Sequence, residues 1–181
     1  TTVGSSAFYS CTGLTTVNLP VCTTVGSSAF YSCTGLTHLT LGVSSFYYNI
    51  IQNCPKLTTI NLPACTSIGA GVFTYCSNLT SVSLPACTTV GSEAFRRCSN
   101  LTSISLPACT TIGTAAFINC TNLTSVSLPV CETIGHSAFA YCSSLTSINL
   151  PACTTVSNYA FNGCTKLSSI SLPACTTFTS F

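Results

Sequence analysis

Leucine recurs along this chain at an almost constant interval. The leucines that begin each repeat are Leu14, Leu36, Leu57, Leu79, Leu101, Leu123, Leu145 and Leu167. The interval is 22 residues, except for one of 21 residues between Leu36 and Leu57. A unit of this length cannot bury its own apolar side chains, so neighbouring units must stack and bury them together. We therefore predict one solenoid domain over residues 1–181, with seven complete repeats at 14–166 and a partial repeat at each end.

The first half of each repeat predicts a short β-strand. In repeat 79–100, Val82 and Leu84 are separated by one serine, which is the alternation of a strand with one buried face. Pro85 follows, and because proline has no N–H to donate, the strand must end there. We expect parallel strands about three or four residues long, stacked at about 4.8 Å.

The second half of the same repeat predicts one or two turns of helix. Ser92 is suited to the N-cap, and Glu93 favours the positive end of a helix. Phe95 and Cys98 then share one apolar face at helical spacing. Asn100, two residues after the cysteine, suits the left-handed turn that ends a helix.

Two motifs resemble a known family of repeats. The pattern L-x-x-[VI]-x-L-x-x-C-x-x-[VI] at residues 79–90 resembles the strand segment of cysteine-bearing leucine-rich repeats. The pattern G-[ST]-x-A-F-x-x-C-[ST]-x-L at residues 91–101 resembles the BspA-like subfamily. This resemblance covers essentially the whole chain. It implies an α/β fold: a right-handed, curved leucine-rich-repeat solenoid with short parallel strands on the concave face and short helices on the convex face.

The resemblance also implies a cell-surface or secreted protein, of a kind that often serves in adhesion. The chain begins in the middle of a repeat, without a methionine or a signal segment, so we interpret it as part of a longer protein. Its open ends would expose the apolar core, and we expect end-to-end self-association there.

Charge and hydropathy exclude two classes of partner. Only 3% of the residues are charged, against about 25% in an average soluble protein. The net charge of +2 is too sparse for a surface that follows a phosphate backbone, so we expect no nucleic acid partner. Polar residues, proline or glycine interrupt every apolar run, so we expect no membrane insertion either.

The fifteen cysteines fall into two columns of the repeat. One column contains Cys11, Cys33, Cys54, Cys76, Cys98, Cys120, Cys142 and Cys164, and the other Cys22, Cys65, Cys87, Cys109, Cys131, Cys153 and Cys175. Disulfides between neighbouring units are geometrically conceivable, but inward-facing columns and an odd count favour free, buried thiols. The cysteines lie too far apart in sequence for the usual zinc ligand pairs. We expect no metal and no cofactor.

The sequence contains no arrangement typical of catalysis, so we predict that the chain is not an enzyme. Only His38 and His136 could act as imidazole bases, and neither belongs to a motif. Glu93 and Arg97 stand four residues apart on the predicted helix, which indicates an exposed pair with a small effect on stability.

The expected strands present two outward columns of serine, threonine and asparagine. Such a face can bind a glycan or protein by hydrogen bonds, but small polar residues also simply keep an exposed sheet soluble. A water-ordering or ice-binding surface is disfavoured because the expected face is curved.

The short repeat at 36–56 departs most from the others, and we place the candidate ligand-binding residues there and in the following strand. Phe46 aligns with Ile68, and Ile51 aligns with Phe73, while the missing residue and the missing cysteine are expected between Val43 and Phe46. A drifted repeat that is repacked with larger side chains would explain the same pattern. The candidate ligand-binding residues are His38, Thr40, Tyr47, Tyr48, Thr59 and Asn61.

Two functions remain in view. The first is a surface or secreted binding module for an extracellular protein or glycan, which acts through weak contacts multiplied along the array. The second is a structural spacer without a ligand of its own.

Overall fold

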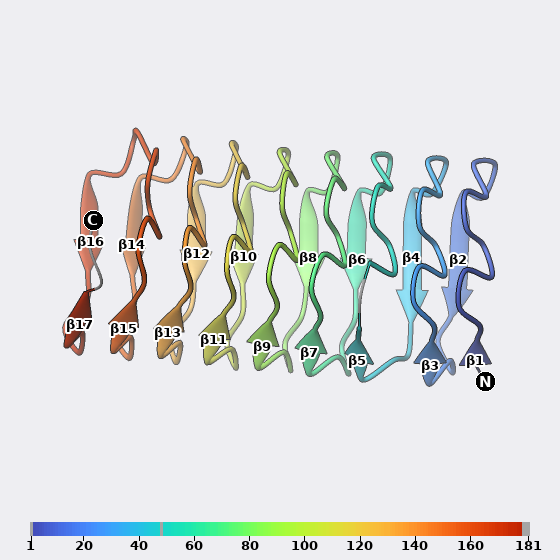
Figure 1. Cartoon of the computed structure of the whole chain (residues 1–181), viewed down its shortest axis with the longest axis horizontal. Helices are drawn as coiled ribbons and strands as arrows, with labels where there is room; N and C mark the ends of the chain where they lie inside the picture. Colours follow the sequence, from blue (N-terminus) through green and yellow to red (C-terminus); the bar gives the residue numbers. More distant parts are fainter. Residues whose placement is uncertain (1, 48, 179–181) are drawn as a thin grey trace.

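In the computed structural model, which describes residues 2–47 and 49–178, the chain winds into a parallel β-solenoid of about eight turns (Figure 1). Every regular element of the described residues is a β-strand. Each complete turn contributes one longer strand and one strand of two residues, with a run of tight turns between the short strand and the next long one. We call these turns of the solenoid coils.

The long strands pair side by side in parallel. They are β2 (Thr16–Leu19), β4 (His38–Leu41), β6 (Thr59–Asn61), β8 (Ser81–Ser83), β10 (Ser103–Ser105), β12 (Ser125–Ser127), β14 (Ser147–Asn149) and β16 (Ser169–Ser171). The strands from β2 to β12 form a six-stranded sheet, and the pair β14–β16 continues the stack beside it (Figure 1). Their outward side is the long-strand face.

The short strands form a second parallel stack. They are β1 (Thr2–Val3), β3 (Thr24–Val25), β5 (Ser45–Phe46), β7 (Ser67–Ile68), β9 (Thr89–Val90), β11 (Thr111–Ile112), β13 (Thr133–Ile134), β15 (Thr155–Val156) and β17 (Thr177–Phe178). The strands from β5 to β17 form a seven-stranded sheet, and β1 pairs with β3.

The register of the strands confirms the predicted repeat. Ile60 pairs with Val82, and Ser103 pairs with Ser125, so equivalent positions of neighbouring repeats lie side by side. Along β6, β10 and β14 the middle side chain faces inward and its serine, threonine or asparagine neighbours are exposed. The two-residue alternation in the sequence therefore predicted this sheet correctly.

The core consists of columns of equivalent apolar residues that run along the solenoid. The phenylalanine column shows the packing: Phe95 lies between Phe73 and Phe117, with ring centroids 5.2 Å away on each side. Phe95 is fully buried, as are Leu79 and most other members of these columns. Each buried leucine or phenylalanine contributes about 2 kcal/mol relative to exposure, and almost all of that burial comes from the neighbouring coils.

The predicted helices are absent from the described residues, and a series of tight turns takes their place. The N–H groups of Arg96 and Cys98 donate to the carbonyls three residues earlier, at 3.1 Å in both cases. The N–H groups of the residues before them donate to the next coil instead. Phe95 N–H donates to Ala116 O at 2.8 Å, and Arg97 N–H donates to Ile118 O at 2.9 Å. These turns occupy residues 91–100 of the coil at 79–100. We call the side of the solenoid that such turns form the turn face.

The prediction that Ser92 and Asn100 lie at the two ends of a helix was therefore wrong as well. Glu93 and Arg97 have positive φ angles of 57° and 60°, whereas Asn100 does not. A positive φ at the third residue of a turn is what a type II turn requires. Ser92 does not begin a helix either; it lies inside the first of these turns, which closes with the bond from Ala94 N–H to Gly91 O.

The close spacing of the coils explains why turns replace helices. Strands stack at about 4.8 Å, whereas an α-helix with its side chains is about 10 Å wide. The turn segments are thin enough to follow the spacing of the strands and to bond directly to each other. At Gly91 the neighbouring backbone is so close that a Cβ atom would lie 2.8 Å from Gly69 C.

The abundant threonines also serve the stacking. Thr80 Oγ1 donates to Thr58 O in the preceding coil at 3.1 Å, and Thr88 Oγ1 donates to Thr66 O at 3.0 Å. These side chains satisfy carbonyl groups at the edges of the strands. Part of the serine and threonine content is therefore structural rather than available for a ligand.

Candidate functional site

Four of the predicted site residues lie together on the long-strand face. His38 pairs with Thr59 and Thr40 pairs with Asn61 in the register of β4 with β6, and all four are exposed. Adjacent strands lie about 4.8 Å apart, so these side chains form one compact polar patch. We call His38, Thr40, Thr59 and Asn61 the strand patch.

His38 is held by its neighbour within this patch. Its Nδ1 atom lies 2.9 Å from Thr37 Oγ1, and the same hydroxyl lies 2.9 Å from Thr15 O in the preceding coil. The remaining ring nitrogen, Nε2, is on the exposed side of the sheet and can bond to a ligand. The patch can therefore offer an imidazole, an amide and two hydroxyl groups, which suits hydrogen bonding to polar ligands and no covalent chemistry.

The structure does not bring Tyr47 to this patch. Tyr47 follows β5, which belongs to the short-strand stack, whereas His38 begins β4 in the long-strand sheet (Figure 1). The Tyr47 side chain is 64% exposed. Tyr48 lies outside the described residues. Tyr47 therefore lies at another sheet than the four residues of the strand patch.

The short repeat has one residue fewer than the others, and the position of this missing residue differs from the one expected. Ser44 O accepts a bond from Thr66 N–H at 2.7 Å, and Thr66 O accepts the equivalent bond from Thr88 N–H at 2.8 Å. Ser44 is thus equivalent to Thr66, and the preceding residue, Val43, is equivalent to Cys65. The missing residue lies before Val43, where Gly42 takes the place of a proline and alanine pair.

Gly42 is required at this turn. A Cβ atom on it would lie only 2.0 Å from Pro20 O of the preceding coil. Val43 then fills the cysteine column and is fully buried. The predicted replacements Phe46 for Ile68 and Ile51 for Phe73 are confirmed by the pairing of β5 with β7 and by the burial of both side chains.

The cysteines are free thiols, and all are buried except Cys11, which is exposed, and Cys175, which is partly exposed. Cys98 Sγ donates to Phe73 O at 3.2 Å, and Cys87 Sγ donates to Thr89 O at 3.3 Å; the same two bonds recur in neighbouring coils. Cysteine is thus a small apolar side chain that also satisfies a carbonyl group.

Burial also removes the chemical reactivity of these thiols. It raises the pKa of Cys76 and of Cys120 to about 12, and that of Cys109 to about 11. A thiol with such a pKa stays protonated at neutral pH and is neither a nucleophile nor a good metal ligand. Among the described residues, no group of three or more histidine, cysteine or carboxylate side chains is arranged to hold a metal ion.

The turn face carries a cluster that the helix predicted there did not reveal. Arg96 Nη1, not Arg97, pairs with Glu93 Oε2, at 2.9 Å. Arg97 instead lies over the ring of Tyr75 in the preceding coil, with its Cζ atom 5.3 Å from the ring centroid. Tyr75 and Arg97 are separated by one repeat length, so alignment of the repeats could have revealed this contact.

Glu132 and His136 also stand four residues apart in the sequence, but no helix joins them in the structure. The His136 ring instead meets the ring of Tyr159 in the next coil edge to face, with centroids 5.6 Å apart.

No helix in the described part of the chain is long or apolar enough to cross a bilayer.

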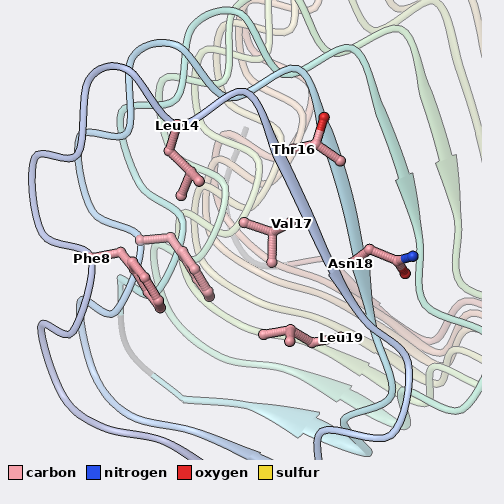
Figure 2. A pocket seen from close by; sticks show the side chains of 7 residues that line it. Phe8, Leu14, Thr16, Val17, Asn18 and Leu19 are labelled. Carbon is pink, nitrogen blue, oxygen red and sulfur yellow. The ribbon is translucent and has the colours of Figure 1, made fainter.

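The first coil leaves one end of the core open. Figure 2 shows Phe8, Leu14, Val17 and Leu19 around a pocket of about 180 Å³, while Thr16 points away from it. The pocket is lined almost entirely by apolar side chains, which belong to the same columns that other coils cover elsewhere. The expected end-to-end association through this pocket stays a prediction.

Comparison with known proteins agrees with this architecture. A family model described as BspA type leucine-rich repeat region matches residues 1–124 and 88–181. A crystal structure of the leucine-rich repeat protein TpLRR of T. pallidum is 31% identical, with a TM-score of 0.73, over 80% of this chain and 71% of that one. No significant match is found among curated protein sequences.

A more distant likeness concerns the fold alone. The pneumococcal vaccine antigen PcpA is 18% identical, with a TM-score of 0.51, and the match covers 90% of this chain but 56% of that protein. The family model and the T. pallidum structure both match most or all of the sequence. The chain therefore belongs to the family of BspA-type leucine-rich repeat proteins.

Proposed function

We propose that this chain is a non-enzymatic binding module of a cell-surface or secreted protein, and that it recognises an extracellular protein or glycan through the long-strand face. One observation carries this proposal. Two columns of exposed polar side chains run without interruption along the long strands, on a rigid framework whose interior is already filled. Membership of the BspA type supports it, because that resemblance implies surface proteins that often serve in adhesion.

The chemistry of this face determines how it would bind. Its hydroxyl and amide groups offer hydrogen bonds, but the outward columns contain no tyrosine, tryptophan or arginine, the residues that dominate strong interfaces. Each contact would be weak, and affinity would come from repetition along several coils. The strand patch is the most varied part of the face, since it combines an imidazole with an amide.

The test measures binding of the 181-residue chain to immobilised glycans and extracellular matrix proteins. The triple variant His38→Ala, Thr40→Ala and Asn61→Ala should weaken binding of any ligand found by about tenfold or more. The matched control carries Ser103→Ala, Ser105→Ala and Ser127→Ala on the same face, and should change binding about twofold or less.

The alternative is a spacer that holds other domains apart. The even succession of coils along one axis favours it (Figure 1), as does the lack of aromatic and arginine side chains on the long-strand face. A chain that binds nothing on these arrays, while it remains folded, would support the spacer and reject the binding module. Equal losses in both triple variants would reject the strand patch as the site.

A further inference from the structure

The turn face carries an unpaired positive charge that the fold does not use. Only four lysines and arginines occur in the chain, and two of them, Arg96 and Arg97, are adjacent. Arg96 is neutralised by its ion pair with Glu93, whose oxygen lies 2.9 Å from it. Arg97 is exposed and makes no ion pair within residues 2–47 and 49–178. The charge of Arg97 is therefore presented to the solvent.

Tyr75 holds this charge in position. The guanidinium carbon of Arg97 lies 5.3 Å from the centroid of the Tyr75 ring, and that of Arg96 lies 6.0 Å from it. Both distances are in the range of a cation–π contact. A guanidinium that is already oriented loses less conformational freedom when a ligand binds it. The contact thus leaves the donor groups of Arg97 prepared for an anionic partner.

Arg97 belongs to a row of large side chains at equivalent positions of successive coils. The row is Tyr75, Arg97, Asn119 and Tyr141. Backbone bonds connect these coils directly, because Tyr75 N–H donates to Arg96 O and Arg97 N–H donates to Ile118 O, both at 2.9 Å. With coils about 4.8 Å apart, the two tyrosines lie about 14 Å from each other, on either side of Arg97 and Asn119. Tyr75 is 37% exposed and Tyr141 is 49% exposed.

The backbone conformation at these positions does not favour large side chains. Tyr75, Arg97 and Tyr141 have φ angles of 64°, 60° and 61°, in the left-handed region. Glycine and asparagine adopt this region most readily, and Gly163 occupies the equivalent position one coil after Tyr141, with φ of 71°. Tyrosine and arginine are less favourable there than glycine, so the turn conformation does not select them.

We propose that the row Tyr75, Arg97, Asn119 and Tyr141 is a docking surface for an acidic segment of another protein. The two terminal N–H groups of Arg97 would bind one carboxylate as a fork, and the flanking tyrosine rings would contact the apolar parts of the segment. Tyrosine and arginine dominate protein interfaces, and tyrosine with asparagine is typical of surfaces that bind proteins. This surface lies apart from the long-strand face, so it stands whether or not the strand patch binds a ligand.

The test uses labelled peptides with Glu-Ala-Pro repeats and with Gln-Ala-Pro repeats of the same length. The intact 181-residue chain should bind the glutamate peptide more tightly, and Arg97→Gln should weaken that binding about tenfold. Lys166→Gln removes the same charge elsewhere and should change it by less than about twofold. Tyr141→Ala, which leaves the charge unchanged, should weaken it about threefold.

Several results would overturn the proposal. The first is that the intact chain binds the glutamate and glutamine peptides with equal affinity. The second is that Arg97→Gln binds the glutamate peptide as tightly as the intact chain does. The third is that Lys166→Gln loses as much affinity as Arg97→Gln. Polygalacturonate is the control for carboxylates on a glycan, and tighter binding of it than of the glutamate peptide would also reject a protein partner. If thermal melting shows that Arg97→Gln is unfolded, Tyr141→Ala decides the question in its place, and unchanged binding by it would reject the row.

Discussion

The coil at 36–56 and the coil at 79–100 reach the same backbone with different side chains. Both place one long and one short strand in register with their neighbours, although the first is one residue shorter. In the regular coil, Phe95 lies in the phenylalanine column. In the short coil, Ile51 occupies that column, and Phe46 stands where the following coil has Ile68.

The short coil exchanges the places of a large and a smaller side chain. The ring of Phe46 lies 6.0 Å from that of Phe73 and is tilted by 58°, so it contacts the column from the side of the short strand. Ile51 is fully buried at the position of the column residue, so the short coil contributes no ring to the phenylalanine column. The comparison teaches that stacking requires the total volume of a coil and the close approach of its backbone, and that the identity of each residue matters less.

The largest effect should come from the phenylalanine column. Phe95→Ala removes a ring that is stacked on both sides and should lower the free energy of unfolding by about 3–5 kcal/mol. Ile51→Ala should lower it by about 2 kcal/mol, because isoleucine is smaller and the Phe46 ring, which meets Phe73 in the same column, can fill part of the cavity. Urea denaturation followed by circular dichroism measures both. Equal losses would show that Phe46 does not compensate.

The next effect concerns the close approach of the backbones. Gly91→Val places side-chain atoms against Gly69 C and Ile68 O, where a Cβ atom would lie 2.8 and 2.9 Å away, and should cost about 1–3 kcal/mol. Tyr47 is at the equivalent position of the short coil and is exposed, so Tyr47→Val should cost less than about 0.5 kcal/mol. The melting temperatures of the two variants compare them. If Gly91→Val melts like the parent chain, the coils are less tightly stacked than described.

The smallest effect concerns the cysteine column that the short coil fills with Val43. Cys87→Val copies that exchange and should cost less than about 1 kcal/mol in unfolding free energy. Cys98→Val lies in the other column, where the thiol donates to Phe73 O at 3.2 Å, and should cost about 1–2 kcal/mol. Urea midpoints distinguish the two. A larger loss for Cys87→Val would mean that the two columns differ in a way that Val43 does not reveal.

The repeat made much of the fold predictable, because its period indicates which residues of neighbouring coils lie side by side. The spacing of Leu57, Leu79 and Leu101 predicts which residues align in the sheets, and Pro85 predicts where a strand ends. The turn face was not predictable in the same way. Ala94, Phe95 and Cys98 all face the core from the tight turns, as they would from one face of a helix, and only bonds to another coil distinguish the two. Such bonds depend on the spacing of the coils, which no single repeat encodes.

The candidate site was predictable only in part for the same reason. His38, Thr40, Thr59 and Asn61 were brought together correctly, because strand register follows from the repeat. Tyr47 does not join these four residues, and the sequence did not reveal this because the corner between the two sheets has no periodic signal. The pairing of Glu93 with Arg97 was wrong once the helix was absent.

Amide hydrogen exchange, resolved residue by residue with NMR, tests the central claim most directly. The claim is that the turn face is bonded from coil to coil, like the strands. The N–H groups of Phe95, Phe117 and Phe139, which donate to the next coil at 2.8, 2.7 and 2.8 Å, should then exchange as slowly as that of Ile104 in β10. Fast exchange at the three phenylalanines, or the sequential contacts of an α-helix across residues 92–98, would contradict the account.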